Sequence, residues 1–164
     1  GNVKLCIENT IRTFNYQAHT KILIARISNP YGPGQDFNKG VGFIDAAIKK
    51  TIRSEKIEIW GDGNNVRDYI YIDDVCRMLI SLFYYQEDYD TFNISSNTGT
   101  SQRDVIRMLE AMQLAPQVEY LPARSVDAKK IILNNERIMS IHAVPLVPVE
   151  QGIRKYYQWL KKEI

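Results

Sequence analysis

Residues 21–35 read KILIARISNPYGPGQ, an apolar, β-branched run that leads into a segment rich in proline and glycine. The almost continuous apolar stretch 21–27 is typical of a strand that is buried on both faces of a parallel sheet. The prolines and glycines at 30–34 then favour a tight loop. Ligands of open α/β sheets bind beyond the carboxyl ends of the strands. This stretch therefore predicts an α/β fold with a loop beside a candidate ligand site.

Helical and extended patterns alternate around this stretch. Helices are predicted at 4–14, 41–52 and 73–85, after a capping-box pattern at Ser101, and after Pro148. Asp73 is expected to cap the helix that it precedes. Short strands are predicted at 56–60, 69–72, 91–94 and 118–121. Only 21–27 has the character of a central parallel strand, so we expect the chain to start inside or just before a helix of a larger α/β protein.

The composition excludes several classes of protein. Lys and Arg number 21 against 19 Asp and Glu, so the net charge is +2. A charge this small gives no electrostatic reason to expect binding to nucleic acid or to an anionic membrane. No run of 18 apolar residues predicts a membrane span, and no leader pattern precedes the first helix. Cys6 and Cys76 lack metal-type spacing. We therefore expect reduced thiols, no metal site and a cytoplasmic location.

The nine glycines of the chain do not form a dinucleotide-binding turn. Such a turn carries the spacing G-x-G-x-x-G between a strand and a helix, because the backbone must approach the pyrophosphate closely. After Gly32 and Gly34, the position of the third glycine is occupied by Phe37. After Gly61 and Gly63, it is occupied by Val66. There is likewise no P-loop, so the chain alone is not expected to bind NAD tightly.

Four stretches together carry a resemblance to a known family: GNVKLCIEN at 1–9, RISNPYGPGQ at 26–35, IWGDGNNVRDYIYIDDV at 59–75 and ARSVD at 123–127. In this order they resemble the C-terminal half of the extended short-chain dehydrogenase/reductases, specifically the UDP-glucose 4-epimerase-like nucleotide-sugar enzymes. The resemblance covers essentially the whole chain. It implies that 1–36 are the last helix and strand of a Rossmann-like NAD(P)-binding domain whose glycine-rich N-terminal half is absent. Residues 37–164 would then form a small, mixed α/β nucleotide-sugar-binding domain, with some segments returning to the first.

The family's catalytic motif is Tyr, three residues, then Lys on one helix, a spacing that puts both side chains on one face. The resemblance makes Lys4 that lysine, which contacts the nicotinamide ribose and lowers the pKa of the tyrosine. The tyrosine would then directly precede Gly1 and is absent here. Without the resemblance, Lys4 is an ordinary solvated lysine of an amphipathic helix.

The resemblance also assigns binding residues around the sugar and the base. Asn29 would contact the nucleotide-sugar, and Tyr31 would lie near the nicotinamide as a cofactor-binding residue. Trp60 stands where the family places an aromatic or apolar residue beside the base. Tyr69 alternates with Arg67 along a strand and would support it, and Val41 would border the nucleotide through its backbone. The alternatives are a tight proline–glycine turn at 29–34 and an aromatic ring that closes a small core at Trp60.

Two arginines stand at the family's diphosphate positions. Planar guanidinium groups match the oxygens of a nucleotide-sugar diphosphate, and Arg67 and Arg124 are the candidates, with Asp127 as a further substrate-binding residue. The family usually has glycine before that aspartate, whereas this chain has Val126. The alternatives are an Arg67–Asp68 turn pair and an exposed Arg124–Asp127 ion pair, each of which adds little stability.

The resemblance thus implies an NAD-dependent nucleotide-sugar epimerase that acts on a UDP-hexose, with NAD as cofactor, a UDP-sugar as ligand and a homodimer when full length. This chain would be its substrate-binding portion, inactive alone. A sister 4,6-dehydratase or decarboxylase shares the same anchor motifs. A non-catalytic nucleotide-sugar-binding module and a structural remnant that binds no ligand stay open as well.

Overall fold

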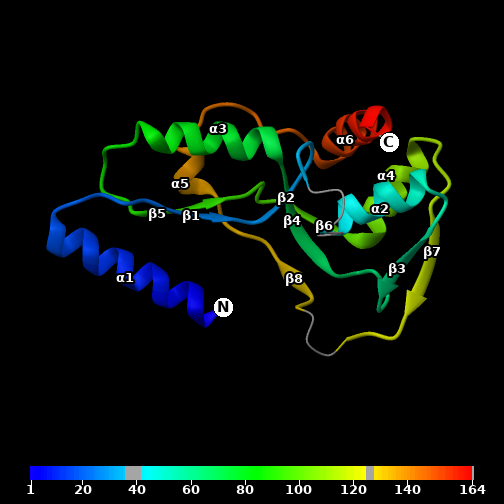
Figure 1. The fold of residues 1–164 in the computed structure, drawn as a ribbon, viewed down its shortest axis with the longest axis horizontal. Coiled ribbons are helices and arrows are strands. Elements are labelled where there is room, and N and C mark those ends of the chain that lie inside the picture. The colour runs from blue at the N-terminus through cyan, green and yellow to red at the C-terminus, as the bar shows by residue number, and fades with distance from the viewer. Residues whose placement is uncertain (36–41, 125–127, 164) are drawn as a thin grey trace.

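The computed structural model describes residues 1–35, 42–124 and 128–163 (Figure 1). Its N-terminal part comprises α1 (Asn2–Ala18), β1 (Ile24–Ile27), β2 (Asn29–Tyr31), α2 (Phe43–Ile52), β3 (Lys56–Trp60), β4 (Val66–Tyr71) and α3 (Ile72–Phe83). The chain continues through β5 (Thr91–Ile94), β6 (Gly99–Ser101), α4 (Gln102–Ala111), β7 (Gln117–Leu121), β8 (Lys130–Ile131), α5 (Glu136–Met139) and α6 (Val149–Glu163). This is a mixed α/β fold, as the sequence predicted.

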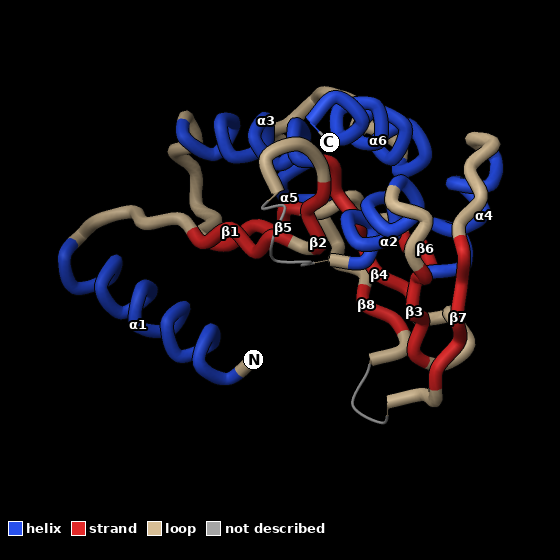
Figure 2. The backbone as a smooth tube through the Cα atoms, turned by 45° about the vertical axis from the view of Figure 1, so that its right-hand side comes forward, coloured by secondary structure: helices blue, strands red, loops and turns tan. Residues whose placement is uncertain are grey.

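The strands pair mostly in parallel. β1 pairs with β5, and β3 pairs with β7, both in parallel. β4 is the central strand of the molecule, because β2 and β8 pair with it in parallel and β6 pairs with it in antiparallel fashion. Figure 2 shows the strands in red as short, separate segments, with helices around them. The arrangement places the ends of β2, β3 and β4 close to α2 and α4.

Two apolar clusters hold the fold together, and Figure 1 places them toward opposite ends of the long axis. One lies among β5, α3 and α5, where Met78, Phe92 and Ile138 are fully buried. The other lies among α2, α4, α6 and β3, with residues such as Ile48 and Leu109 at its centre. Each such side chain contributes about 1.5–3 kcal/mol by leaving water. The predicted boundary after residue 36 falls outside the described residues and stays a prediction.

Several local predictions are confirmed. β3 and β5 have the predicted bounds, and the helices at 4–14, 41–52 and 73–85 correspond to α1, α2 and α3. The capping box at α4 is present: Ser101 Oγ accepts from the Asp104 amide at 3.1 Å, and the Ser101 amide donates to Asp104 Oδ2 at 3.0 Å. The backbone amides of Ser101 and Asp104 have no partner within the helix, and the capping box satisfies both. It therefore fixes the residue at which α4 begins.

The prediction that Asp73 caps α3 is wrong. β4 runs directly into α3, so Tyr71 occupies the N-cap position and makes no side-chain cap bond. Asp73 instead lies in the first turn, where it favours the positive end of the helix dipole. The next carboxylate, Asp74, is buried and accepts from the Val147 amide at 2.8 Å and from the Arg77 guanidinium.

The prediction of a strand buried on both faces over 21–27 is also wrong. β1 begins only at Ile24, and Ile27 is 42% exposed. Among the described residues β1 pairs on one side only, with β5, and the Arg26 side chain turns to Glu8 of α1. Residues 29–31, predicted as part of a loop, instead form β2, because β4 offers them a parallel partner.

Helix α1 lies on one side of β1 and β5, opposite α3 and α5 (Figures 1 and 2). Polar contacts attach it. Arg26 donates to Glu8 through two nitrogens, at 2.8 and 2.5 Å, and Arg12 donates to Asp90 Oδ2 at 3.2 Å. Its apolar side chains Ile7 and Phe14 are 55% and 50% exposed. Within the described residues, no helix combines the length and apolar character that a bilayer span requires.

Candidate functional site

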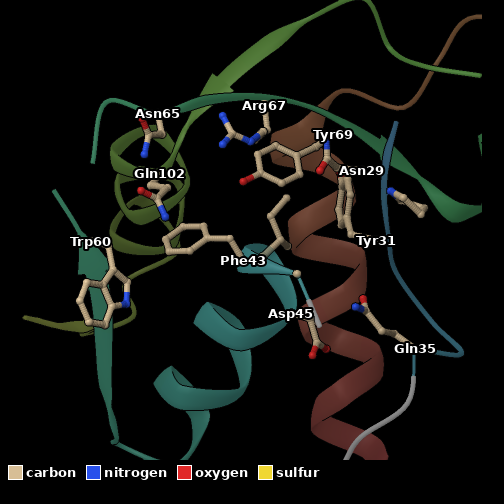
Figure 3. Close-up of a pocket in the computed structure, with 13 residues that line it drawn as sticks. Asn29, Tyr31, Gln35, Phe43, Asp45, Trp60, Asn65, Arg67, Tyr69 and Gln102 are labelled. Atoms are coloured by element: carbon tan, nitrogen blue, oxygen red, sulfur yellow. The ribbon is translucent and has the colours of Figure 1, made fainter. Parts of the chain in front are cut away.

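A cavity of about 250 Å³ opens where β2 and β4 meet α2, β3 and α4 (Figure 3). Its lining combines aromatic rings, side-chain amides and single charged groups, a composition typical of small-molecule sites. The lining residues are Asn29, Pro30, Tyr31, Gln35, Gly42, Phe43, Ile44, Asp45, Trp60, Asn65, Arg67, Tyr69 and Gln102. Five of the residues predicted from the sequence therefore share one cavity: Asn29, Tyr31, Trp60, Arg67 and Tyr69.

The parallel register of β2 and β4 places Asn29 opposite Tyr69. The Asn29 side-chain amide donates to the Asp68 carbonyl at 2.9 Å, which fixes its orientation at the cavity wall. Tyr69 is buried, and burial raises the pKa of its hydroxyl to about 12, against an opposing effect of the Arg67 charge. The Tyr69 hydroxyl is therefore protonated at neutral pH and can donate to a ligand oxygen.

Asp68 anchors the strand that carries Arg67 and Tyr69. Its carboxylate is fully buried and accepts from the Ser96 amide and the Ser96 hydroxyl, both at 2.8 Å. It also accepts from the amides of Asn97 and Leu133, each at 3.2 Å. Successive side chains of a strand alternate between faces, so tying Asp68 down on one face directs its two neighbours to the other. Arg67 is not among these donors to Asp68, so these hydrogen bonds do not include the alternative Arg67–Asp68 turn pair.

Arg67 brings a positive charge to the cavity. Its Nη1 donates to the carbonyls of Val66 at 2.9 Å and Ala128 at 2.7 Å, which bridges β4 to the segment before β8. Figure 3 shows its guanidinium beside the Tyr69 ring. A guanidinium that backbone carbonyls hold in this way is preorganised for phosphate oxygens.

Trp60 separates this cavity from a neighbouring one. The Arg124 guanidinium lies over the Trp60 ring, 3.7 Å from its centroid, a cation–π arrangement. Arg124 lines the neighbouring cavity of about 430 Å³ together with Gly61, Ala123 and Lys129. Arg124 thus contacts Trp60, which lines both cavities, but Arg124 itself lines only the second one. Val41 and Asp127, the other predicted substrate residues, lie outside the described residues.

Tyr31 is 4% exposed and belongs to the core as well as to the cavity. Its hydroxyl donates to the Val149 carbonyl at 3.2 Å, and burial raises its pKa. A Cβ at Gly152 of α6 would lie 2.1 Å from this hydroxyl, so only glycine allows the approach. Tyr31 also lines an adjoining cavity of about 560 Å³ along residues 28–35, the predicted loop.

Lys4 is separate from these residues. Its side chain is exposed in the first turn of α1, and it lines none of the cavities found among the described residues. Its assignment as the catalytic lysine stays a prediction. Within the described part of the chain, no group of three or more His, Cys, Asp or Glu side chains could hold a metal ion.

The resemblance placed Phe43 in the segment 41–43 expected to border the nucleotide, but three other cavity-lining side chains were not singled out from the sequence: Asp45, Asn65 and Gln102. Asp45 is 1% exposed, pairs with Lys49 at 2.8 Å and accepts from the Tyr156 hydroxyl at 2.5 Å. Its i,i+4 spacing to Lys49 is a visible signal, but one that surface helices share. Gln102 directly follows the capping serine, where the pattern indicated only a helix start.

Comparison with known proteins identifies the family of this chain. Residues 1–95 match the NAD dependent epimerase/dehydratase family. The chain is 29% identical to the dTDP-L-rhamnose 4-epimerase of Burkholderia thailandensis, over all of this chain and 46% of that protein. It is 28% identical to the UDP-glucose 4-epimerase of Thermotoga maritima, solved with UDP-glucose. Their TM-score is 0.90, and the match covers 99% of this chain and 53% of that one.

The chain spans about half the length of the curated relatives it matches, and the matching part is their C-terminal half. Other curated relatives are named as a putative UDP-glucose 4-epimerase of Methanocaldococcus jannaschii and as dTDP-glucose 4,6-dehydratases of Xanthomonas campestris, so activities differ among them. The family match covers more than half of the chain. On these grounds, and on a fold that follows the C-terminal half of the extended short-chain enzymes, this chain belongs to the NAD dependent epimerase/dehydratase family.

Proposed function

We propose that this chain is the nucleotide-sugar-binding part of a 4-epimerase that acts on a UDP-hexose. The observation that carries the proposal is the single cavity that Asn29, Trp60, Arg67 and Tyr69 share. It combines a base-sized aromatic surface, a preorganised guanidinium and neutral donors for hydroxyl groups. The Thermotoga maritima relative, solved with UDP-glucose, supports this choice of ligand.

The residues divide the ligand among them. Arg67 binds the diphosphate, with Arg124 as the second arginine and Asp127 as the partner carboxylate of Arg124, while Trp60 and the Val41 backbone border the base. Asn29 and Tyr69 donate to the oxygens of the sugar or phosphate. Binding energy gathered at the nucleotide anchors the substrate while leaving its sugar ring free to turn, which an epimerase needs.

NAD is the cofactor of the family, and when bound it supplies a hydride acceptor. The residues of this chain do not form its pyrophosphate cradle, because no glycine-rich turn joins a strand to a helix in the sequence. Lys4 would contact the nicotinamide ribose, and Tyr31 would border the cofactor from the end of β2.

The proposal is tested by calorimetric titration with UDP-glucose. Arg67→Lys removes the guanidinium fork but keeps one positive charge, so we expect affinity to fall about tenfold or more. Arg53→Lys, at the end of α2, is the matched control and leaves affinity unchanged. Equal affinity of the wild type and the Arg67→Lys variant would contradict the assignment.

Product analysis of the full-length protein then distinguishes the activities. Incubation with NAD and UDP-glucose gives UDP-galactose if the enzyme is a 4-epimerase. A 4-keto-6-deoxy product identifies a dehydratase, and binding without turnover identifies a binding module. Either of the last two results would replace the proposed epimerase activity.

A further inference from the structure

One end of the cavity is built from two aromatic rings and two side-chain amides. In Figure 3 the amides of Asn65 and Gln102 and the rings of Phe43 and Trp60 gather at this end, whereas Arg67 and Tyr69 line the middle. Aromatic faces stack on any nucleobase, so the rings alone carry no selectivity. Side-chain amides can hydrogen-bond the edge of a base and therefore can select it.

Gln102 stands at the capped start of a helix. It is the first residue of α4, directly after the capping box that Ser101 and Asp104 form. Its Oε1 is buried, and no hydrogen-bond donor among the described residues reaches that oxygen. A buried carbonyl oxygen without a donor costs free energy, and native proteins leave few of them. An oxygen of this kind in the lining of a cavity fits a donor supplied by a ligand.

We propose that Gln102 is a specificity-determining residue whose Oε1 accepts a hydrogen bond from the N3–H of a uracil or thymine base. This inference rests on the proposed nucleotide-sugar function. N3–H is the only donor on the ring edge of these bases, and carbonyl oxygens flank it. The Gln102 amide has one acceptor and two donors, so its Nε2 can at the same time donate to a flanking carbonyl.

The proposed contact selects a class of nucleotide rather than one nucleotide. Uracil and thymine share the N3–H edge and differ at C5, so Gln102 accepts both UDP- and dTDP-sugars. Adenine has no ring N–H at its pairing edge, and its donor there is the exocyclic N6 amino group, so an adenine nucleotide supplies Oε1 with a donor only in a shifted position. Any discrimination between uracil and thymine must come from residues that face C5.

A thermodynamic cycle between protein and ligand tests this contact. UDP and N3-methyl-UDP are titrated into the full-length wild type and a Gln102→Met variant, which keeps the side-chain length and removes the acceptor. In the wild type, N3-methylation is expected to weaken binding about tenfold or more. In Gln102→Met, UDP binding is weakened about tenfold, and methylation then changes it by less than about threefold. Gln151→Met, exposed on α6, is the matched control and behaves like the wild type.

Two results would overturn the inference. The first is a wild type that binds UDP and N3-methyl-UDP within about twofold, a comparison that needs no variant. The second is an equal loss on methylation in the wild type and in Gln102→Met, which shows that the residue and the N3–H act independently. Both leave UDP binding itself intact. A wild type that fails to bind UDP contradicts the proposed function as well.

Discussion

At the scale of single residues, the site depends on groups that the fold holds in one protonation state. Burial is the main cause of the raised pKa of Tyr69, and it also raises the pKa of Tyr31. Both hydroxyls are consequently neutral across the physiological range. The positive charge of the cavity comes from the Arg67 guanidinium. Ligand binding through these groups is therefore expected to be insensitive to pH near neutrality.

The raised pKa of Tyr69 predicts a change of stability in alkali. The ordinary pKa of tyrosine is about 10 and the folded value about 12, so the folded state binds this proton more tightly. The resulting stabilisation is fully present below pH 10 and is lost as the pH rises through 12. Two pKa units correspond to about 2–3 kcal/mol.

Urea unfolding of the wild type and Tyr69→Phe between pH 9 and 12 measures this loss. As the pH rises, the free energy of unfolding of the wild type is expected to fall by about 2–3 kcal/mol relative to that of Tyr69→Phe. Tyr16→Phe, whose side chain is 85% exposed, is the control and follows the wild type. Parallel curves for the wild type and Tyr69→Phe would show that the folded state does not favour the Tyr69 proton.

At the scale of elements, α1 differs from the other long helices in being attached by polar contacts. The Arg26 hydrogen bonds are the first cause of the lowered pKa of Glu8, and the charges of Arg26 and Arg12 add to it. Because the folded pKa is depressed, this attachment is present above the ordinary pKa of 4.5 and is lost as the pH falls through the folded value.

Glu8→Gln is therefore expected to loosen α1 at neutral pH. Backbone amides of α1 should exchange with deuterium several-fold faster, while those of α4 keep their rate. Acidification of the wild type should produce the same local effect. Glu110→Gln, exposed on α4, is the control. Unchanged exchange in α1 of the Glu8→Gln variant is the outcome that excludes this role for the carboxylate.

At the scale of the whole molecule, the exposed apolar residues of α1 favour an interface. Val3, Ile7 and Phe14 recur at helical spacing and are 74%, 55% and 50% exposed. Contiguous apolar surface of this kind marks interaction sites. We propose a homodimer through this helix, together with a division into a part that completes the Rossmann-like sheet and a nucleotide-sugar-binding part.

Light scattering over a range of concentrations tests the dimer. The wild type is expected to approach twice the mass of one chain, and Ile7→Glu should raise the dissociation constant at least about tenfold, since it buries an unpaired charge. Ile80→Glu, at an exposed position of α3, is the control and leaves dimerisation intact. A monomer at all concentrations, or a dimer that Ile80→Glu disrupts instead, contradicts an interface on α1.

The parts of the fold that could be predicted are those with a local cause. β3 and β5 follow from short segments in which polar and apolar residues alternate, and α4 follows from its capping box. β2 could not be found in this way, because three residues with a proline at the centre become a strand only through pairing with β4. Similarly, family motifs predict Arg67 and Trp60, whereas Gln102 reaches the cavity only because α4 packs beside α2 and follows β6, which pairs with β4.

Binding of a uridine nucleotide in the cavity beside Trp60 can be observed at the Trp60 indole itself. The chain has two tryptophans, and Trp159 lies on α6, stacked on Tyr156, which provides an internal reference. In a ¹H–¹⁵N NMR titration with UDP, the Trp60 indole resonance should shift and saturate while that of Trp159 stays in place. Assignment by Trp60→Phe identifies the two signals. A titration in which neither resonance moves, or only that of Trp159 does, would contradict nucleotide binding beside Trp60.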